Sequence, residues 1–367
     1  MLRPPAPARW AARPSRIGLV GYGFISGGHL AGIARLDGVE VVAVVDVCIE
    51  RRAAARRELP GVHVVGDLAD LDVDELDALL ICTPPGSHLD AIVFGLEAGL
   101  AVICEKPLVP TVRELDALEA ACAAAPGLLY PSHNYLSAPS VQSLLRIVSE
   151  RRSSEGPLSG HLRTQRVGHA RGVPEWSPDW RRDRATSGGG IIQDHGPHSF
   201  YLASAFVGRR PNRVRCDLRR PGDGPFRDTE DYAFIHLSYH DGSRFTIELD
   251  WNASVRQTSY LLYGDWGHAR VIDDQMDWSV GGSGGSRRIV SNFDDPSHSE
   301  WFESVWRGFL DPARVDERFE LLDEALWTVK IVAGCYRSAT EAGAWVHLGD
   351  DPAVRLAAPP TPARPAI

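Results

Sequence analysis

The stretch RIGLVGYGFIS at residues 16–26 decides the fold. Its first five residues predict a buried strand, and a glycine-rich turn follows before a helix that we expect to end near Leu36. In this G-x-G-x-x-S pattern, Gly21 permits the tight turn and Gly23 lets the backbone approach a pyrophosphate at the helix N-terminus. Ser26 is small enough for the third place. This order of strand, turn and helix predicts a dinucleotide-binding unit, although a glycine-rich turn that binds nothing is the alternative.

Short apolar runs continue to alternate with helical patterns as far as about residue 136. We expect further strands at 39–46, 61–65, 76–84, 100–107 and 128–134, and helices at 49–59, 87–99 and 111–125. Thr111 and Glu114 form a capping box at the start of the last helix. The alternation predicts a doubly wound parallel sheet with right-handed crossovers, a Rossmann domain at 16–136.

After residue 136 the apolar residues repeat with a period of two. We expect strands at 161–171, 212–220, 231–240, 243–254 and 259–271, and helices at 140–152, 298–310 and 319–341. The chain is therefore an α/β protein whose second domain, 137–350, carries a large, mostly antiparallel open sheet with one face toward solvent or a partner. The Pro- and Ala-rich ends, 1–15 and 351–367, are expected to be disordered tails.

Composition narrows the class of protein. Acidic residues outnumber basic ones by 48 to 39, for a net charge of −9, which disfavours a sequence-independent grip on nucleic acid. No uncharged apolar stretch reaches the roughly 18 residues of a membrane span. The first residues contain no apolar signal region, and none of the six cysteines forms a C-x-x-C pair. We expect a cytoplasmic protein with neither membrane nor nucleic-acid partners.

Lysine is unusually scarce in this chain, because the 39 basic residues comprise 37 arginines and only Lys106 and Lys330. Lys106 belongs to Glu105-Lys106-Pro107, at the end of an expected strand and hence at the edge of the ligand crevice. An ammonium there can donate a hydrogen bond to a substrate oxygen. Chance, or an ordinary surface lysine, is the alternative.

Two other loops are expected at the same crevice. Asp46 ends the second strand, 23 residues after Gly23, where a carboxylate binds ribose hydroxyls and repels a 2′-phosphate; this favours NAD(H) over NADP(H), although Arg51 and Arg52 lie just beyond. The loop Thr83-Pro84-Pro85-Gly86-Ser87-His88 follows the fourth strand and can line the nicotinamide ribose. The alternative interpretation is that Ser87 only caps the next helix and that His88 is an exposed helix residue.

A second constellation, SGGGIIQDHGPH, occupies residues 187–198. Its three glycines suggest that backbone comes close to a ligand. Asp194 and His198 are four apart and share one helix face, while His195 points elsewhere. A histidine beside a carboxylate titrates near neutrality and suits general acid–base work. A metal site on these residues is disfavoured because thiolates and a second ligand cluster are absent; a capped helix with a satisfied buried histidine is the other alternative.

Taken in order, the blocks GYGFIS, Asp46, TPPGSH, EKP and Trp180-Arg181-Arg182-Asp183 leading into SGGG, Asp194 and His198 resemble the Gfo/Idh/MocA oxidoreductase family over about residues 16–348. The resemblance implies a two-domain NAD(P)-dependent enzyme related to glucose–fructose oxidoreductase and inositol dehydrogenase. It implies a homodimer or homotetramer formed through the C-terminal sheet.

The resemblance also implies residue roles, with Lys106, Asp194 and His198 as the catalytic trio. The cofactor contacts that we expect are Gly21, Gly23, Phe24, Ile25, Asp46, Thr83, Pro84, His88, Glu105 and Lys106. The expected substrate contacts are Asn134, Tyr135, Trp176, Trp180, Arg181 and His195. The chain departs from the family at His133-Asn134-Tyr135, where an Arg-rich pattern is common, and at Tyr201, where Asp often stands three residues after the catalytic His.

These expectations describe an enzyme that interconverts a secondary alcohol and a ketone on a sugar, cyclitol or related polar ring. His198 takes or gives the hydroxyl proton, Asp194 orients His198 and the substrate, and Lys106 hydrogen-bonds the reacting oxygen. One alternative is an enzyme with transient redox chemistry on bound NAD, whose net reaction is epimerisation or hydrolysis. Others are a non-catalytic, ligand-sensing regulator and, more weakly, an imine or biliverdin-type reductase.

Overall fold

The computed structural model of the chain describes residues 14–151, 156–289 and 298–349. The expected tail at 351–367 lies outside these ranges. So does the expected tail at 1–15 except for its last two residues, and Ser15 already belongs to the first strand.

The N-terminal sheet is parallel and has six strands in the order β3-β2-β1-β4-β5-β6. The strands are β1 (Ser15–Val20), β2 (Val39–Val45), β3 (His63–Val65), β4 (Ala78–Ile81), β5 (Ala101–Cys104) and β6 (Leu129–Pro131). This order is that of a doubly wound dinucleotide-binding sheet. From β1 the chain adds strands toward one edge of the sheet, and from β4 it adds them toward the other edge, which leaves a crevice at the carboxyl ends of β1 and β4. The predicted Rossmann sheet is confirmed.

Four helices connect these strands, namely α1 (Phe24–Ile33), α2 (Ile49–Glu58), α3 (His88–Glu97) and α4 (Val112–Ala124). The predicted N-cap of α4 is present, because the Thr111 hydroxyl accepts a hydrogen bond from the backbone N–H of Glu114. The Glu114 carboxylate accepts from the Thr111 hydroxyl at 2.5 Å, in place of the backbone N–H that a full capping box uses. Short 3-10 turns fill the longer loops, at Leu68–Asp70, Val73–Glu75, Pro85–Ser87, Asn134–Ser137, Trp180–Arg182 and Pro312–Arg314.

The second sheet has nine strands in the order β14-β13-β12-β11-β7-β10-β9-β8-β15, and only the β7–β10 pair is parallel. The strands are β7 (Ser159–Gln165), β8 (Arg213–Arg219), β9 (Tyr232–Ser238), β10 (Arg244–Asp250), β11 (Gln257–Gly264), β12 (Gly267–Ile272), β13 (Gln275–Val280), β14 (Ser283–Arg288) and β15 (Val346–His347). The mostly antiparallel sheet is confirmed. The single strand expected at 259–271 is wrong, since a turn divides it into β11 and β12.

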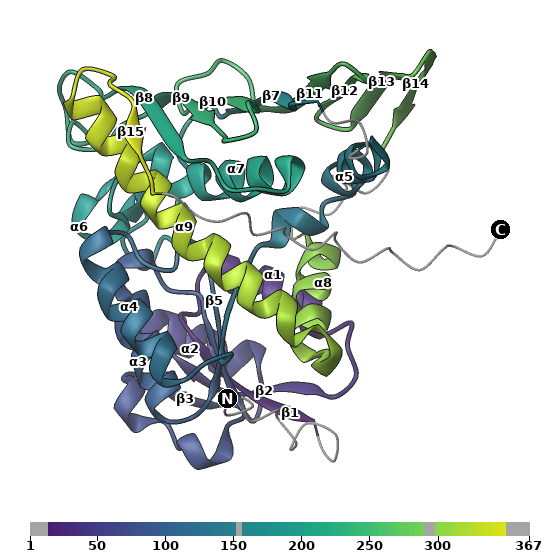
Figure 1. The fold of residues 1–367 in the computed structure, drawn as a ribbon. Coiled ribbons are helices and arrows are strands. Elements are labelled where there is room, and N and C mark those ends of the chain that lie inside the picture. Colours follow the sequence, from purple (N-terminus) through teal and green to yellow (C-terminus); the bar gives the residue numbers. More distant parts are fainter. Residues whose placement is uncertain (1–13, 152–155, 290–297, 350–367) are drawn as a thin grey trace.

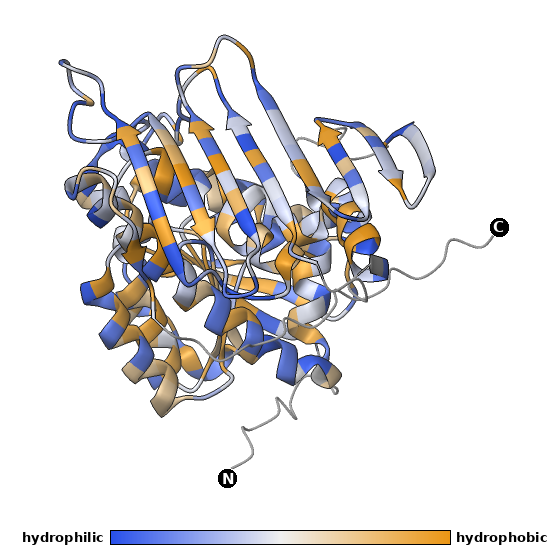
Figure 2. Ribbon diagram, turned by 45° about the horizontal axis from the view of Figure 1, so that its top comes forward, coloured by the Kyte–Doolittle hydropathy of each residue, from blue (hydrophilic) through white to orange (hydrophobic). Residues whose placement is uncertain are grey.

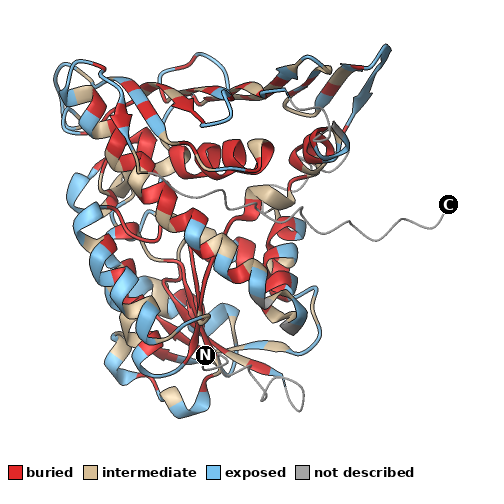
Figure 3. Cartoon of the chain, in the orientation of Figure 1, coloured by how far each residue is buried: buried red, intermediate tan, exposed pale blue. Residues whose placement is uncertain are grey.

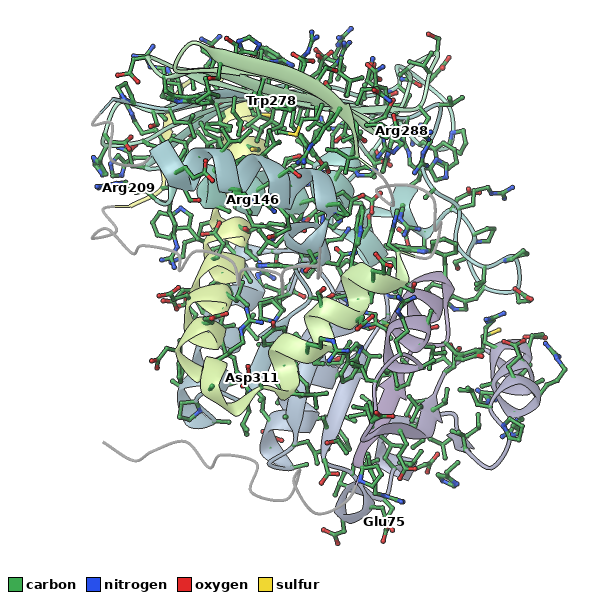
Figure 4. All side chains as sticks on the ribbon, turned by 90° about the vertical axis from the view of Figure 1, so that its right-hand side faces the viewer. Glu75, Arg146, Arg209, Trp278, Arg288 and Asp311 are labelled. Carbon is green, nitrogen blue, oxygen red and sulfur yellow. The ribbon has the colours of Figure 1, made fainter. Side chains whose placement is uncertain are left out.

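Helices cover only one face of this second sheet (Figure 1). They are α5 (Pro139–Arg151), α7 (Ile191–Val207) and α9 (Val315–Thr340), whereas the short α6 (Arg184–Ser187) packs on the loop Pro85–Ser87 and α8 (Ser299–Leu310) packs on α1. Helix α7 lies directly beneath the strands and is almost wholly buried (Figure 3), with 14 of its 17 residues enclosed. Polar and apolar residues alternate along the strands of this sheet (Figure 2), and in β7 and β10 the less buried positions, such as Arg163, Thr246 and Glu248, are polar. Figure 4 views the molecule from the side of α5. The label of Arg146 identifies this helix, which lies below the strands that carry Trp278 and Arg288.

The last two helices return to the N-terminal sheet. One face of that sheet is covered by α3, α4 and α9, and the other by α1, α2 and α8, whose Val305, Trp306 and Phe309 belong to its core. The residues expected to form a separate second domain, 137–350, therefore supply part of the first hydrophobic core. No helix within the described ranges is both long and apolar enough to cross a bilayer.

Trp306 tests how much this return contributes to stability. Its side chain is fully buried between α8 and the N-terminal sheet, so Trp306→Ala should lower the free energy of unfolding by about 3–5 kcal/mol. Denaturant titration measures this loss. Phe319→Ala on α9 is the control, because Phe319 is 36% exposed and should lose less than about 1 kcal/mol. Equal losses in the two variants would contradict the assignment of Trp306 to the core of the N-terminal sheet.

Candidate active site

A cleft runs along the carboxyl ends of the N-terminal strands and is closed on its other side by residues that precede and begin α7. Nine of the ten expected cofactor residues line it, namely Gly21, Gly23, Phe24, Ile25, Asp46, Thr83, Pro84, Glu105 and Lys106. Four residues expected at the substrate or in catalysis line it from the part of the chain after residue 136: Trp176, Trp180, Arg181 and Asp194. The structure thus brings together residues that are more than 170 positions apart in sequence.

The glycine-rich turn has the geometry that a pyrophosphate site needs. Gly21 has φ +90, and a Cβ atom there would lie 2.9 Å from the backbone nitrogen of Thr83, so only glycine fits. A Cβ on Gly23 would meet nothing within 4 Å, and no side chain caps α1. Gly23, Phe24 and Ile25 line the cleft, so the uncapped N-terminus of α1 borders it, and a helix N-terminus favours an anion.

Asp46 is fixed beside this turn by two backbone hydrogen bonds. Its Oδ2 accepts from the N–H of Tyr22, and its Oδ1 accepts from the N–H of Cys48, both at 2.8 Å. Each carboxylate oxygen keeps a further lone pair for a hydroxyl donor. The carboxylate is therefore held rigidly at the end of β2.

The two arginines beyond Asp46 are engaged elsewhere. Arg51 donates from Nε to the carbonyl of Tyr22 at 2.8 Å, and its Nη1 lies 3.7 Å from Oε1 of Glu175, which follows the N-terminal sheet in sequence. Arg52 donates to the carbonyl of Asp46 at 2.7 Å. Both guanidinium groups are thus hydrogen-bonded to backbone carbonyl oxygens, and Arg51 also lines the cleft.

His88 corrects the expectations for the loop after β4. Its side chain is 0% exposed and does not line the cleft, so it is not an exposed helix residue and does not touch a ligand there. Its Nε2 lies 2.8 Å from the carbonyl of Thr83, and its Nδ1 lies 2.8 Å from the carbonyl of Pro107. The imidazole thus holds the TPPGSH loop against the EKP turn.

Lys106 joins the two halves of the chain. Its Nζ donates to the backbone carbonyl of Asp194 at 2.7 Å and lies 3.7 Å from that residue's Oδ1. The preceding residue, Glu105, is buried and pairs with the buried His29 at 3.0 Å. Burial alone would raise the pKa of the Glu105 carboxyl, but the hydrogen bond and charge of His29 and the charge of Lys106 lower it.

Asp194 is surrounded by cationic and polar side chains. Its Oδ1 accepts from Nε of Arg181 at 3.1 Å, and its Oδ2 lies 3.5 Å from Nε2 of His195. Burial would raise the pKa of this carboxyl, but Arg181, His195 and Lys106 outweigh it and hold the pKa well below its usual range. His195 therefore does not point away from the Asp194 carboxylate, contrary to expectation.

His198 lies one turn further along α7, 9% exposed, and does not line the cleft. Its Nδ1 lies 2.8 Å from the hydroxyl of Tyr201, and the ring of Tyr135 lies 4.1 Å away between centroids. Burial, reinforced by the charge of Lys106, lowers its pKa well below the ordinary value. The expected titration near neutrality is wrong, because desolvation outweighs the attraction of Asp194.

The glycines before α7 serve the protein's own packing. A Cβ on Gly190 would lie 1.9 Å from the carbonyl oxygen of Glu230, and one on Gly189 would lie 1.8 Å from the hydroxyl of Tyr336. Gly190 also lines the cleft, so the expected close approach to a ligand stays a prediction beside this packing role. The carboxylate of Glu230, 1% exposed, accepts hydrogen bonds from the N–H groups of Gly190 and Ile192, both at 3.0 Å. The role of Glu230 was not predicted; its signal in the sequence was the Glu230-Asp231 pair just before β9.

The remaining expected substrate residues differ in accessibility. Arg181 stacks on the ring of Trp180 at 4.3 Å and lines the cleft with Trp176. Asn134 is buried and Tyr135 half-buried, and both lie outside the cleft lining beside His198 and Tyr201. In the parts of the chain that the structure describes, no three His, Cys, Asp or Glu side chains gather as a metal-binding group.

Comparison with known families agrees with this architecture. Residues 15–133 match an oxidoreductase family with an NAD-binding Rossmann fold, and residues 158–270 match the GFO/IDH/MocA C-terminal domain. The chain belongs to the GFO/IDH/MocA oxidoreductase family. The resemblance drawn from the sequence motifs is thereby confirmed.

Curated relatives of this family member are named for sugar and cyclitol chemistry. D-apiose dehydrogenase of Paraburkholderia graminis is 33% identical over 133 residues, 36% of each chain. The scyllo-inositol 2-dehydrogenase (NADP(+)) IolW of Bacillus subtilis is 26% identical over 225 residues, 61% of this chain and 60% of the relative. The chain thus matches about a third to three fifths of the length of these two relatives.

Solved structures share the whole fold. An inositol dehydrogenase homolog complexed with NAD+ from Azotobacter vinelandii superimposes with a TM-score of 0.76 at 21% identity, covering 95% of this chain and 100% of the other. Levoglucosan dehydrogenase in complex with NADH and levoglucosan gives a TM-score of 0.78 at 19% identity, covering 92% and 100%. At these identities the likeness establishes the fold.

Buried neutral histidines give the stability of the protein a defined pH dependence. Burial lowers the pKa of His133 to about 3, so the unfolded chain takes up a proton near pH 6.5 that the folded chain refuses. The free energy of unfolding should therefore fall as the pH falls below about 6.5. For one such group the slope is about 1.4 kcal/mol per pH unit.

His133→Asn should remove this share of the slope. Between pH 6 and 4.5, the free energy of unfolding of the variant should change less steeply than that of the unsubstituted protein, by about 1 kcal/mol per pH unit. Denaturant titrations in matched buffers measure both slopes. Parallel curves would contradict a neutral, buried His133.

Proposed function

We propose that the protein is an NAD-dependent dehydrogenase or ketoreductase that interconverts a secondary alcohol and a ketone on a sugar, cyclitol or similar polar ring. The observation that carries the proposal is the contact of Lys106 with Asp194 in the cleft that also holds the uncapped N-terminus of α1. The relatives named as sugar and inositol dehydrogenases support the class of substrate.

The residues present fit a dinucleotide. The open space at Gly23 and the N–H groups of α1 suit the pyrophosphate, and Asp46 suits the adenosine ribose. When bound, the nicotinamide supplies the carbon that accepts or gives the hydride. Lys106 then lies where a nicotinamide and a substrate meet, at the carboxyl end of β5.

In this proposal two side chains act on the substrate oxygen and a third, Asp194, positions its neighbours. Lys106, whose ammonium is held by Asp194, donates a hydrogen bond that stabilises negative charge on that oxygen. His198 exchanges the hydroxyl proton. Asp194 keeps its carboxylate charged because Arg181 and Lys106 surround it, and it positions Lys106 and His195 rather than bonding His198 directly.

NAD(H) is the preferred cofactor in this proposal. Asp46 would face the 2′-position of the adenosine ribose, where its charge repels a phosphate. Arg51 is directed to the Tyr22 carbonyl and toward Glu175, which lowers its value as a phosphate ligand. The face of the nine-stranded sheet that no helix covers (Figure 1) is the surface through which we infer that copies pair as a homodimer or homotetramer.

Substitution of the two central groups tests the activity. Lys106→Ala and His198→Ala should each lower turnover at least about 100-fold, because each removes a group that acts on the reacting oxygen. NAD+ should still bind, as calorimetry measures. NADH absorbance with a panel of sugars, cyclitols and amino sugars gives the turnover.

The chain supplies its own control for this experiment. Lys330, the second of its two lysines, lies on α9 with Nζ 3.7 Å from Glu119 and away from the cleft. Lys330→Ala should leave turnover unchanged. Near-normal turnover in Lys106→Ala or His198→Ala would refute the assigned role, and reduced cofactor that stays trapped on the enzyme would favour transient redox chemistry instead.

The cofactor preference has a separate test by binding. Calorimetry on the unsubstituted protein should show NAD+ bound at least about tenfold more tightly than NADP+, because Asp46 repels the additional phosphate. Asp46→Ala should narrow this ratio, whereas Asp74→Ala, an exposed carboxylate outside the cleft, should preserve it. Tighter binding of NADP+ to the unsubstituted protein would overturn the preference.

A further inference from the structure

Tyr201 occupies the turn of α7 that follows His198. It is 1% exposed, and its phenol oxygen makes two hydrogen-bond contacts. One is with Nδ1 of His198 at 2.8 Å, and the other is with the backbone nitrogen of Tyr135 at 3.2 Å. No residue role assigned above uses this side chain.

The direction of each hydrogen bond follows from the chemistry of the donors. A backbone nitrogen can only donate, so the Tyr135 N–H gives its proton to the phenol oxygen. The phenol proton is then left for the second contact, and it points to Nδ1 of His198. Burial raises the pKa of the Tyr201 hydroxyl well above its ordinary value, so the phenol keeps that proton.

A neutral imidazole carries one proton, and its position is fixed by this contact. Burial keeps His198 neutral, as its lowered pKa indicates. Because Nδ1 accepts the phenol proton, the imidazole proton must be on Nε2. Within the part of the chain that the structure describes, no group hydrogen-bonds Nε2, so this N–H is available to a ligand.

Aromatic contacts hold both rings in place. The ring of His133 stacks on Tyr201 at 4.2 Å, and the ring of Tyr135 lies 4.1 Å from that of His198. These contacts restrict rotation of either side chain out of the hydrogen bond. The fold, and not a bound ligand, thus determines which ring nitrogen of His198 carries the proton.

We propose that Tyr201 is a positioning residue that holds His198 as its Nε2–H tautomer, so that the resting site presents a hydrogen-bond donor to a carbonyl oxygen. A carboxylate at position 201 would have the opposite effect, because it would accept a proton from Nδ1 and leave a lone pair on Nε2 for a hydroxyl group. The site is accordingly built to receive the ketone. This last statement rests on the proposed function, whereas the tautomer does not.

Nitrogen NMR of protein labelled with 15N-histidine tests the tautomer without any substrate. The His198 signals are identified by their absence from His198→Gln. In the unsubstituted protein we expect a protonated Nε2 and a bare, hydrogen-bonded Nδ1. A protonated Nδ1, or an imidazolium at neutral pH, would overturn the proposal.

Two substitutions extend this test. Tyr201→Phe keeps the ring and removes the donor, so the Nδ1 signal of His198 should shift to that of a nitrogen without a hydrogen bond. Tyr201→Asp should move the proton to Nδ1. Tyr239→Phe is the matched control, because Tyr239 is another buried tyrosine of the same core, 3% exposed, and should leave the His198 signals unchanged. An unmoved Nδ1 signal in Tyr201→Phe contradicts the proposal.

Kinetics on any ketone that the enzyme reduces give the functional arm. Tyr201→Phe should lower kcat roughly tenfold, the effect of one lost hydrogen bond, with little change in KM, and Tyr239→Phe should not. An unchanged kcat in Tyr201→Phe would contradict the positioning role. If no ketone in the panel is reduced, the proposed function fails while the NMR result still decides the tautomer.

Discussion

The contact between the Lys106 ammonium and the Asp194 carbonyl oxygen is the interaction on which the site depends. It connects the end of β5 in the parallel sheet to the first turn of α7, which is packed under the second sheet. Both partners are largely enclosed, with side chains 17% and 13% exposed, so their attraction is weakly screened. The relative placement of the two sides of the cleft therefore depends on this hydrogen bond, to which the approach of the Lys106 ammonium to the Asp194 carboxylate at 3.7 Å adds.

Much of this arrangement was predictable because its signals are local. The turn at Gly21 and Gly23 must follow a strand and precede a helix, and the sheet order places Asp46, Thr83 and Lys106 at one edge without any long-range information. Helical spacing likewise put Asp194 and His198 on neighbouring turns. Each of these predictions needed only the period of the secondary structure and the handedness of its crossovers.

The contacts that escaped prediction depend on tertiary packing. Gly190 is glycine because Glu230, forty residues later, presses against it, and no pattern near residue 190 indicates this. His88 is buried between two carbonyl groups from different loops. The pKa of His198 depends mainly on burial of its imidazole within the fold, whereas the sequence shows only the neighbouring carboxylate of Asp194.

The return of α8 and α9 has a consequence for how this protein can be divided. Trp306 and its neighbours on α8 cover one face of the nucleotide-binding sheet, and Leu322, Ala325 and Val329 on α9 cover the other. A fragment cut near residue 136 would leave apolar surface exposed on both sides. The nucleotide-binding half is therefore not a transferable module: recombination or gene fusion that moves it has to carry the last fifty residues of the fold as well.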